Sequence, residues 1–160
     1  MNMGKSATKK YLLLIALACA ALTASNGWAR VNIANTAGLA FGSFAAGTGG
    51  TVIVSPAGVR TKTGGVLLVT STVHAASFNV TRATGSCTQT YTITLPANGT
   101  VTLTSGANSM AVNNFVSNPS GSGRLVACSQ VLTVGATLTV AAGKPAGNYS
   151  GTFNVTAVFP

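Results

Sequence analysis

The chain has 160 residues, a length that suits one domain. It contains nine Lys and Arg residues in total but no Asp or Glu, and only 6% of its residues are charged. The absence of carboxylates excludes paired-carboxylate glycosidases, Ser-His-Asp triads and carboxylate-bound Ca²⁺ or Mg²⁺. His74 is the only histidine, so a multi-histidine zinc site is excluded too. We therefore expect no catalytic residue, no metal, no cofactor and no enzymatic activity.

The first 29 residues are typical of a secretory signal peptide. Lys5, Lys9 and Lys10 precede an apolar run over residues 11–24, which is shorter than the about 20 residues of a membrane span. Small residues favour cleavage after Ala29, with Ala24 as the alternative. The chain is thus expected to be exported to the cell surface or secreted.

Export would remove three cations and leave six along the mature chain. Their scatter argues against a specific nucleic-acid partner and is compatible with weak, salt-dependent attraction to an anionic surface polysaccharide. They are Arg30, Arg60, Lys62, Arg82, Arg124 and Lys144.

The mature chain alternates short apolar segments with turn residues, which predicts β-strands and no helix. Expected strands cover residues 31–35, 39–44, 51–54, 66–69, 78–82, 91–95, 101–104, 110–115, 125–127, 131–134 and 137–140. Residues 59–65 are expected to form a basic loop. Asn98-Gly99 predicts a turn that joins residues 91–95 and 101–104 into a hairpin, and a bulge is expected near Asn113-Asn114. The fold class is therefore a single antiparallel β-sandwich over residues 38–160.

The last segment, residues 146–160, reads as a glycine turn followed by one strand that runs to Pro160. Phe153, Val155, Ala157 and Phe159 stand at a spacing of two and share one face of that strand. The other face carries Asn154, Thr156 and Val158.

Cys87 and Cys128 are the two cysteines that remain after export. An even count in an exported chain predicts one disulfide. It would close a loop of about 40 residues and contribute about 4 kcal/mol in the chain-entropy account.

Two resemblances follow from these motifs. Leu39-Ala40-Phe41-Gly42-Ser43-Phe44, Gly50 to Gly58, Tyr91 to Pro96 and Ala146 to Thr152 resemble a domain family of unknown function found in secreted proteins of Gram-negative bacteria. The terminal strand, with a penultimate Phe159 and with Gly147 about a dozen residues earlier, resembles that of chaperone–usher pilins, including the spore-coat-protein-U-like branch.

The pilin resemblance implies an immunoglobulin-like sandwich that lacks one strand and is completed by a donor strand. It implies a homopolymer of identical subunits, a periplasmic chaperone and an outer-membrane usher as partners, and roles in fimbriae, adhesion and biofilm. Residues 30–37 are then the candidate donor, with Val31 and Ile33 as apolar plugs. Gly147, Phe153, Val155, Ala157 and Phe159 form the corresponding assembly strand.

The sequence therefore predicts a structural subunit of an extracellular fibre. A self-contained secreted sandwich that binds glycan or a surface polymer is the alternative. A third hypothesis is a matrix polymer built from the polar Thr and Asn strands.

Overall fold

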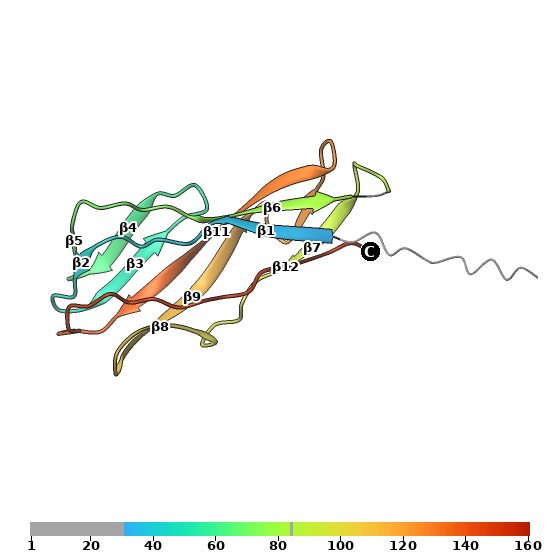
Figure 1. Ribbon diagram of the computed structural model, residues 1–160. Helices are drawn as coiled ribbons and strands as arrows, with labels where there is room; N and C mark the ends of the chain where they lie inside the picture. Colours follow the sequence, from blue (N-terminus) through green and yellow to red (C-terminus); the bar gives the residue numbers. More distant parts are fainter. Residues whose placement is uncertain (1–30, 84) are drawn as a thin grey trace, which may run out of the picture.

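The computed structural model describes residues 31–83 and 85–160, so the predicted signal peptide and Arg30 lie outside the described residues. The described part is all-β and antiparallel, without a helix, as predicted (Figure 1). The strands are β1 (Val31–Ala37), β2 (Phe44–Ala45), β3 (Gly50–Val54), β4 (Arg60–Gly64), β5 (Leu67–Leu68), β6 (Ala76–Arg82), β7 (Thr90–Thr94), β8 (Val101–Ser105), β9 (Asn108–Asn118), β10 (Ser122–Arg124), β11 (Ser129–Val140) and β12 (Thr156–Val158).

The long strand β11 organises the larger sheet. One edge of β11 pairs first with β6 and then with β3, and the other edge pairs with β9. Gly135 stands where the partner changes, and a side chain there would collide with the backbone of Val54 and Ser55. Because glycine has no Cβ, β3 can end directly against β11 at this point. The sequence predicted two separate strands here, whereas the structure has one continuous strand.

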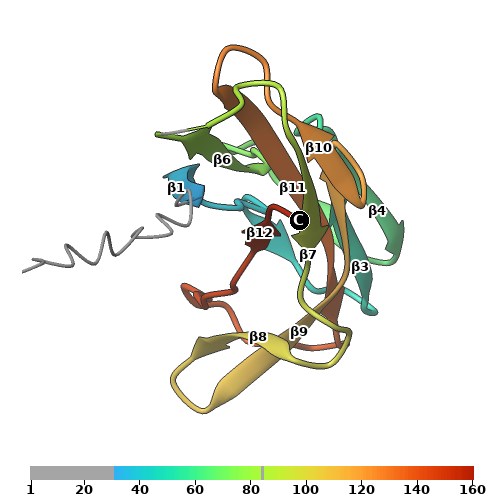
Figure 2. The same cartoon turned by 90° about the vertical axis from the view of Figure 1, so that its right-hand side faces the viewer.

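The sheets form a curled sandwich rather than two flat layers. β1 and β4 are edges of the larger sheet, which carries the β8–β9 hairpin as a separate arm. A second sheet, β10-β7-β12, covers one half of the concave face, and a short pair, β2-β5, lies at the opposite end (Figures 1 and 2). The alternating pattern of β7 buries Tyr91 and Ile93 and exposes the threonines between them.

The predicted hairpin between residues 91–95 and 101–104 is wrong. β7 pairs with β10 and β12, whereas β8 pairs with β9. The Asn98-Gly99 turn is instead attached to β9, because the Gly99 amide donates to Asn113 Oδ1 (2.8 Å) and the Asn114 amide donates to Asn98 Oδ1 (2.8 Å). The turn therefore carries the chain from one sheet to the other.

The bulge predicted near Asn113-Asn114 is confirmed. The register between β9 and β11 shifts there, and Asn114 adopts a φ of 50°. Asparagine tolerates this left-handed conformation better than most residues.

The expected basic loop at residues 59–65 is also wrong, since β4 occupies it. Thr51 of β3 and Thr63 of β4 are paired, and their hydroxyl groups lie 2.7 Å apart. β4 is an edge strand with both faces largely exposed, so it lacks the apolar alternation by which strands are predicted.

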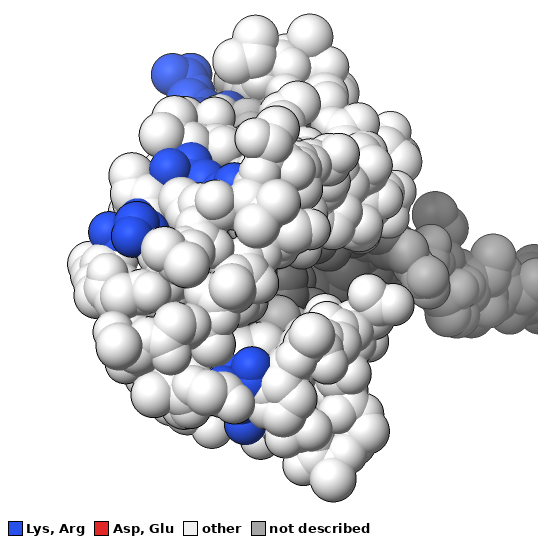
Figure 3. Space-filling model, turned by 90° about the vertical axis from the view of Figure 1, so that its left-hand side faces the viewer, with Lys and Arg blue, Asp and Glu red and all other residues white. Residues whose placement is uncertain are grey.

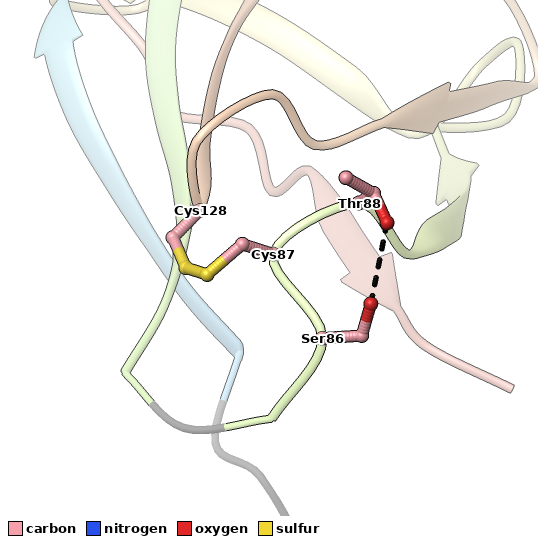
Figure 4. Close-up of a disulfide and its surroundings, with 4 residues drawn as sticks. All are labelled: Ser86, Cys87, Thr88 and Cys128. Atoms are coloured by element: carbon pink, nitrogen blue, oxygen red, sulfur yellow. Dashed lines mark hydrogen bonds between the residues drawn. A yellow bond between two sulfur atoms is a disulfide. The ribbon is translucent and has the colours of Figure 1, made fainter.

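The predicted disulfide between Cys87 and Cys128 is present (Figure 4). It links the residues before β7 to the tight turn between β10 and β11. The Cys128 amide also donates to the Cys87 carbonyl (3.2 Å), and the Ser86 and Thr88 hydroxyls lie 3.3 Å apart beside it. The disulfide thus joins the β10-β7-β12 sheet to β11 at one end of the sandwich.

Candidate functional site: an open sheet edge and two cavities

The C-terminal segment, defined here as residues 141–155, crosses the concave face with few backbone hydrogen bonds. Ser150 exchanges two such bonds with Thr104 of β8 (2.8 and 3.0 Å), and the Gly143 amide donates to Gly47 (3.3 Å). Within the described chain, residues 151–155 belong to no strand. In Figure 2 this segment lies in the opening between the β1–β6 pair and the β8–β9 arm. The half of the core beneath it is therefore covered by side chains rather than by a hydrogen-bonded sheet.

The terminal strand is shorter than predicted, because only residues 156–158 pair with β7. The four side chains expected on one face nevertheless point towards the core. Ala157 is buried, and Phe153, Val155 and Phe159 are half-buried. Asn154, Thr156 and Val158 are exposed. Alternation persists without a ladder because apolar contacts alone hold the stretch before β12.

Aromatic contacts fix this stretch. The Phe153 ring lies 6.3 Å from the Phe78 ring centroid in an edge-on arrangement and 5.1 Å from that of Phe115. Phe159 lies edge-on to Tyr91 at 5.7 Å, and the Arg82 guanidinium stands 5.0 Å from the Phe159 centroid. Aromatic pairs and cation–π contacts of this kind stabilise the fold by more than the apolar surface area that they bury.

Gly147 lies at the far end of the C-terminal segment and is exposed. A Cβ at Gly147 would lie 2.6 Å from Ser105 Oγ, at the tip of the β8–β9 arm. Gly147 therefore marks where the segment passes close to that arm, about 12 residues before Phe159.

The candidate donor residues lie in β1, which is already paired with β6 of the same chain. Val31 is opposite Arg82, and Ile33 is opposite Val80. The Ile33 side chain is half-buried against the same apolar cluster as Ala157 and Phe159. Residues 31–37 are thus the first strand of the sandwich, although the sequence placed them before it.

β1 and β12 are neighbouring edges of the two sheets. They run side by side, but no backbone ladder joins them (Figure 2). A sheet edge leaves N–H and C=O groups available to another strand. We call the gap between these two strands the open edge.

An apolar cavity of about 290 Å³ lies inside the sandwich near the end of β1. It lies between the residues after β1 and residues 151–153 of the C-terminal segment. Its lining includes Leu39, Phe78, Leu103, Val112 and Phe153. We call it the inner cavity.

A larger cavity of about 650 Å³ lies at the β2–β5 end, and we call it the end cavity. Its walls are residues 39–46 and 144–151, and its floor is formed by Leu103, Met110 and Leu138. Figure 3 shows this end of the molecule with a hollow on its surface; one basic cluster lies beside the hollow, the others lie along the opposite border of the view, and no acidic side chain is present. The two cavities share Leu39, Phe41 and Leu103 as lining residues.

Tyr91 is the buried polar side chain beneath the open edge. It is 1% exposed, and its hydroxyl donates to Gln130 Oε1 (2.9 Å). Desolvation by burial raises the pKa of Tyr91 above its ordinary value, because the phenolate is disfavoured there.

The cations have no carboxylate side chain of the same chain to pair with, and two of the arginines bind backbone carbonyls instead. The Arg60 guanidinium donates to the carbonyls of Phe41 (3.1 Å), Ser43 (3.1 Å) and Val69 (2.8 Å) and thereby fastens β2 and β5 to β4. Arg124 similarly donates to Thr88 (3.0 Å).

His74 is half-buried beside Ala40, with which it shares a backbone bridge. Its Nδ1 lies 3.4 Å from the Ala75 carbonyl. Among the residues that the structure describes, no group of three or more His, Cys, Asp or Glu side chains is placed to hold a metal ion. The described chain also has no helix long and apolar enough to cross a membrane.

These features define an all-β sandwich with one open edge. The sequence pattern of a family described as "Domain of unknown function (DUF4402)" matches residues 31–159, and the chain belongs to that family. This match confirms the resemblance to a domain family of unknown function. Comparisons with curated proteins and with solved structures gave no significant match.

Sequence reasoning missed the cavity-lining role of Leu39, Phe41, Phe78 and Leu103. Each falls within an expected strand, and alternation indicates only which side chain of a strand points inward. It does not indicate whether a strand covers that side chain from the opposite layer.

Proposed function

We propose that this protein is a structural subunit of an extracellular fibre and that its subunits join by exchanging β1. The observation that carries the proposal is the open edge, where β1 and β12 adjoin without a ladder. The apolar inner cavity begins at the far end of β1, beside Asn35. β1 is held by hydrogen bonds on one side only, to β6. Because β1 is the outermost strand of the larger sheet, it can leave without separating any other pair of strands.

Exchange replaces each lost contact by an identical one from a neighbouring subunit. A second copy's β1 would pair with β6 and place its Ile33 against the cluster that contains Tyr91 and Ala157. Exchange of identical elements costs little free energy, and a head-to-tail arrangement that does not close produces a filament. Burial of a side chain such as Ile33 contributes up to about 1.5–3 kcal/mol.

The open edge also gives a physical reason for the two partner proteins that the pilin resemblance implies. An exposed edge above apolar side chains is prone to unwanted pairing, so it needs cover until assembly. A periplasmic chaperone that lends a strand beside β12 would provide this cover, and an outer-membrane usher would then guide replacement by the next subunit. The proposed location of the fibre is accordingly the cell surface.

The proposal is tested by Ile33→Asn, with Ala34→Asn as the matched control. Ile33 faces the core, whereas Ala34 is exposed on the opposite side of β1. We expect wild-type and Ala34→Asn protein to form fibres, seen by electron microscopy of exporting cells and of concentrated refolded protein. In exporting cells, Ile33→Asn should form markedly fewer fibres, because its β1 displaces the chaperone's strand less well. In refolded protein it should weaken the monomer and the fibre alike, since Ile33 makes the same contacts in both.

Fibres at the wild-type level from Ile33→Asn in exporting cells would contradict exchange of β1. A wild-type chain that stays monomeric in both preparations would contradict the fibre itself and would favour the self-contained binding module.

A further inference from the structure

The end cavity carries a second inference that is independent of assembly. We propose that it binds a single-chain amphiphile with an anionic head group, such as a long-chain carboxylate, whose head pairs with Lys144. The volume of about 650 Å³ falls within the range of small-molecule sites, and the floor is apolar.

Lys144 supplies the polar end of this site. It lines the cavity and is half-buried, and no hydrogen bond or ion pair to its ammonium occurs within the described residues. The chain contains no Asp or Glu, so no carboxylate side chain of its own can neutralise this cation. A bound anion would supply the missing counter-ion.

The backbone around Lys144 is held on both sides. The Gly143 amide donates to Gly47 (3.3 Å), and the Tyr149 hydroxyl donates to the Pro145 carbonyl (2.9 Å). The cation is therefore kept at the cavity wall, because the residues before and after it are both anchored.

The apolar end of the ligand has an apolar lining to pack against. Met110, Leu138 and Leu103 form the floor of the end cavity, and Leu39 and Phe41 line its wall. An alkyl chain would bury its methylenes against these side chains. Because each buried methylene contributes a similar free energy, affinity should rise about fourfold per added methylene until the cavity is filled.

The experiment is calorimetric titration of the exported chain with soluble decanoate and dodecanoate, compared with dodecanol and with a dodecyl ammonium salt. We expect dodecanoate to bind more tightly than decanoate and the cationic amphiphile not to bind. Lys144→Gln should weaken dodecanoate binding about tenfold and leave dodecanol binding unchanged. Lys62→Gln, which removes an exposed cation from β4, is the matched control and should have no effect.

Met110 provides a direct reporter of location. The other methionines are Met1 and Met3, so Met110 is the sole methionine beyond the predicted signal peptide. With ¹³C-methyl methionine, its signal, assigned by Met110→Leu, should shift in proportion to dodecanoate binding.

The inference would be overturned by absence of dodecanoate binding, by an unshifted Met110 signal, or by equal weakening in the Lys62 and Lys144 variants. Binding only to anionic phospholipid vesicles, and not to soluble dodecanoate, would also overturn it. None of these outcomes bears on fibre formation through β1.

Discussion

At the scale of single residues, Tyr91 combines almost complete burial of its side chain with a specific polar contact. Its ring supports Phe159 at the end of the chain, and its hydroxyl is satisfied by Gln130 on β11. Because burial raises the pKa of Tyr91, the neutral phenol contributes stability that is fully present below the unfolded-state pKa of about 10. That contribution is lost as the pH rises through the higher folded-state pKa.

We expect Tyr91→Phe to lower the free energy of unfolding by about 1 kcal/mol at pH 7, since Gln130 loses its donor. Above about pH 10 the wild-type protein should lose stability steeply, and the variant should lose less. Urea unfolding between pH 7 and pH 11 measures both effects. Parallel pH profiles for the two proteins would show that Tyr91 is not the buried titrating group.

Gly135 is a second decisive residue because it permits β3 and β6 to share one edge of β11. A methyl group there would enter space held by the backbone of Val54 and Ser55, which cannot rotate away. We expect Gly135→Ala to destabilise the fold by about 1–3 kcal/mol. Gly38→Ala is the control, because no atom lies within 4 Å of its Cβ position, and it should change stability by less than about 0.5 kcal/mol.

At the scale of elements, the C-terminal segment depends on side-chain anchors rather than on a ladder. Phe153 contacts Phe78 of β6 and Phe115 of β9, so one ring joins two strands and lines the inner cavity. Local stability is low where buried contacts and backbone hydrogen bonds are few. The segment should therefore open more readily than β6, β9 or β11.

Phe153→Ala should lower the free energy of unfolding by about 2–3 kcal/mol, below the cost at a fully buried site because Phe153 is half-buried. Hydrogen exchange should accelerate more at residues 150–155 than in β11, whose slowest amides exchange by global unfolding and follow only the change in the free energy of unfolding. The exposed neighbour substitution Asn154→Ala should leave both quantities near wild type. Uniform acceleration across the whole sandwich would instead indicate that Phe153 belongs to the common core.

The same elements explain what could be predicted from the sequence. Alternation identified β7, β8 and the inward face of residues 153–159, and cysteine counting identified the disulfide, because these signals are local. Pairing was harder. The Asn98-Gly99 turn has the composition of a hairpin turn, but its hydrogen bonds go to the β9 bulge. β4 was missed because a polar edge strand carries no periodic apolar signal.

At the scale of the whole molecule, the open edge is a property of topology that no sequence window reports. Val31 and Ile33 were predicted as plugs for another subunit, and in the single chain they complete their own sheet. In both placements the Ile33 side chain faces the core. The difference between them lies only in which copy supplies the strand, as in other exchanged assemblies.

The net positive charge of the chain affects how whole subunits approach one another. The described chain carries Lys and Arg without any acidic side chain, so subunits repel one another at long range. Assembly through an apolar strand has to overcome that repulsion, and added salt screens it. Fibre formation should therefore be faster at 0.5 M salt than at 0.05 M.

The most direct measurement of the central claim is a disulfide trap across the β1–β6 ladder. Asn32 and Thr81 are opposite each other, so the double variant Asn32→Cys, Thr81→Cys can form a bond within one chain or between two. In assembled, oxidised protein run under non-reducing denaturing conditions, exchange of β1 predicts a ladder of covalent multimers, whereas either single variant should show no ladder. Protein that is fully cross-linked yet exclusively monomeric on such a gel would contradict the account.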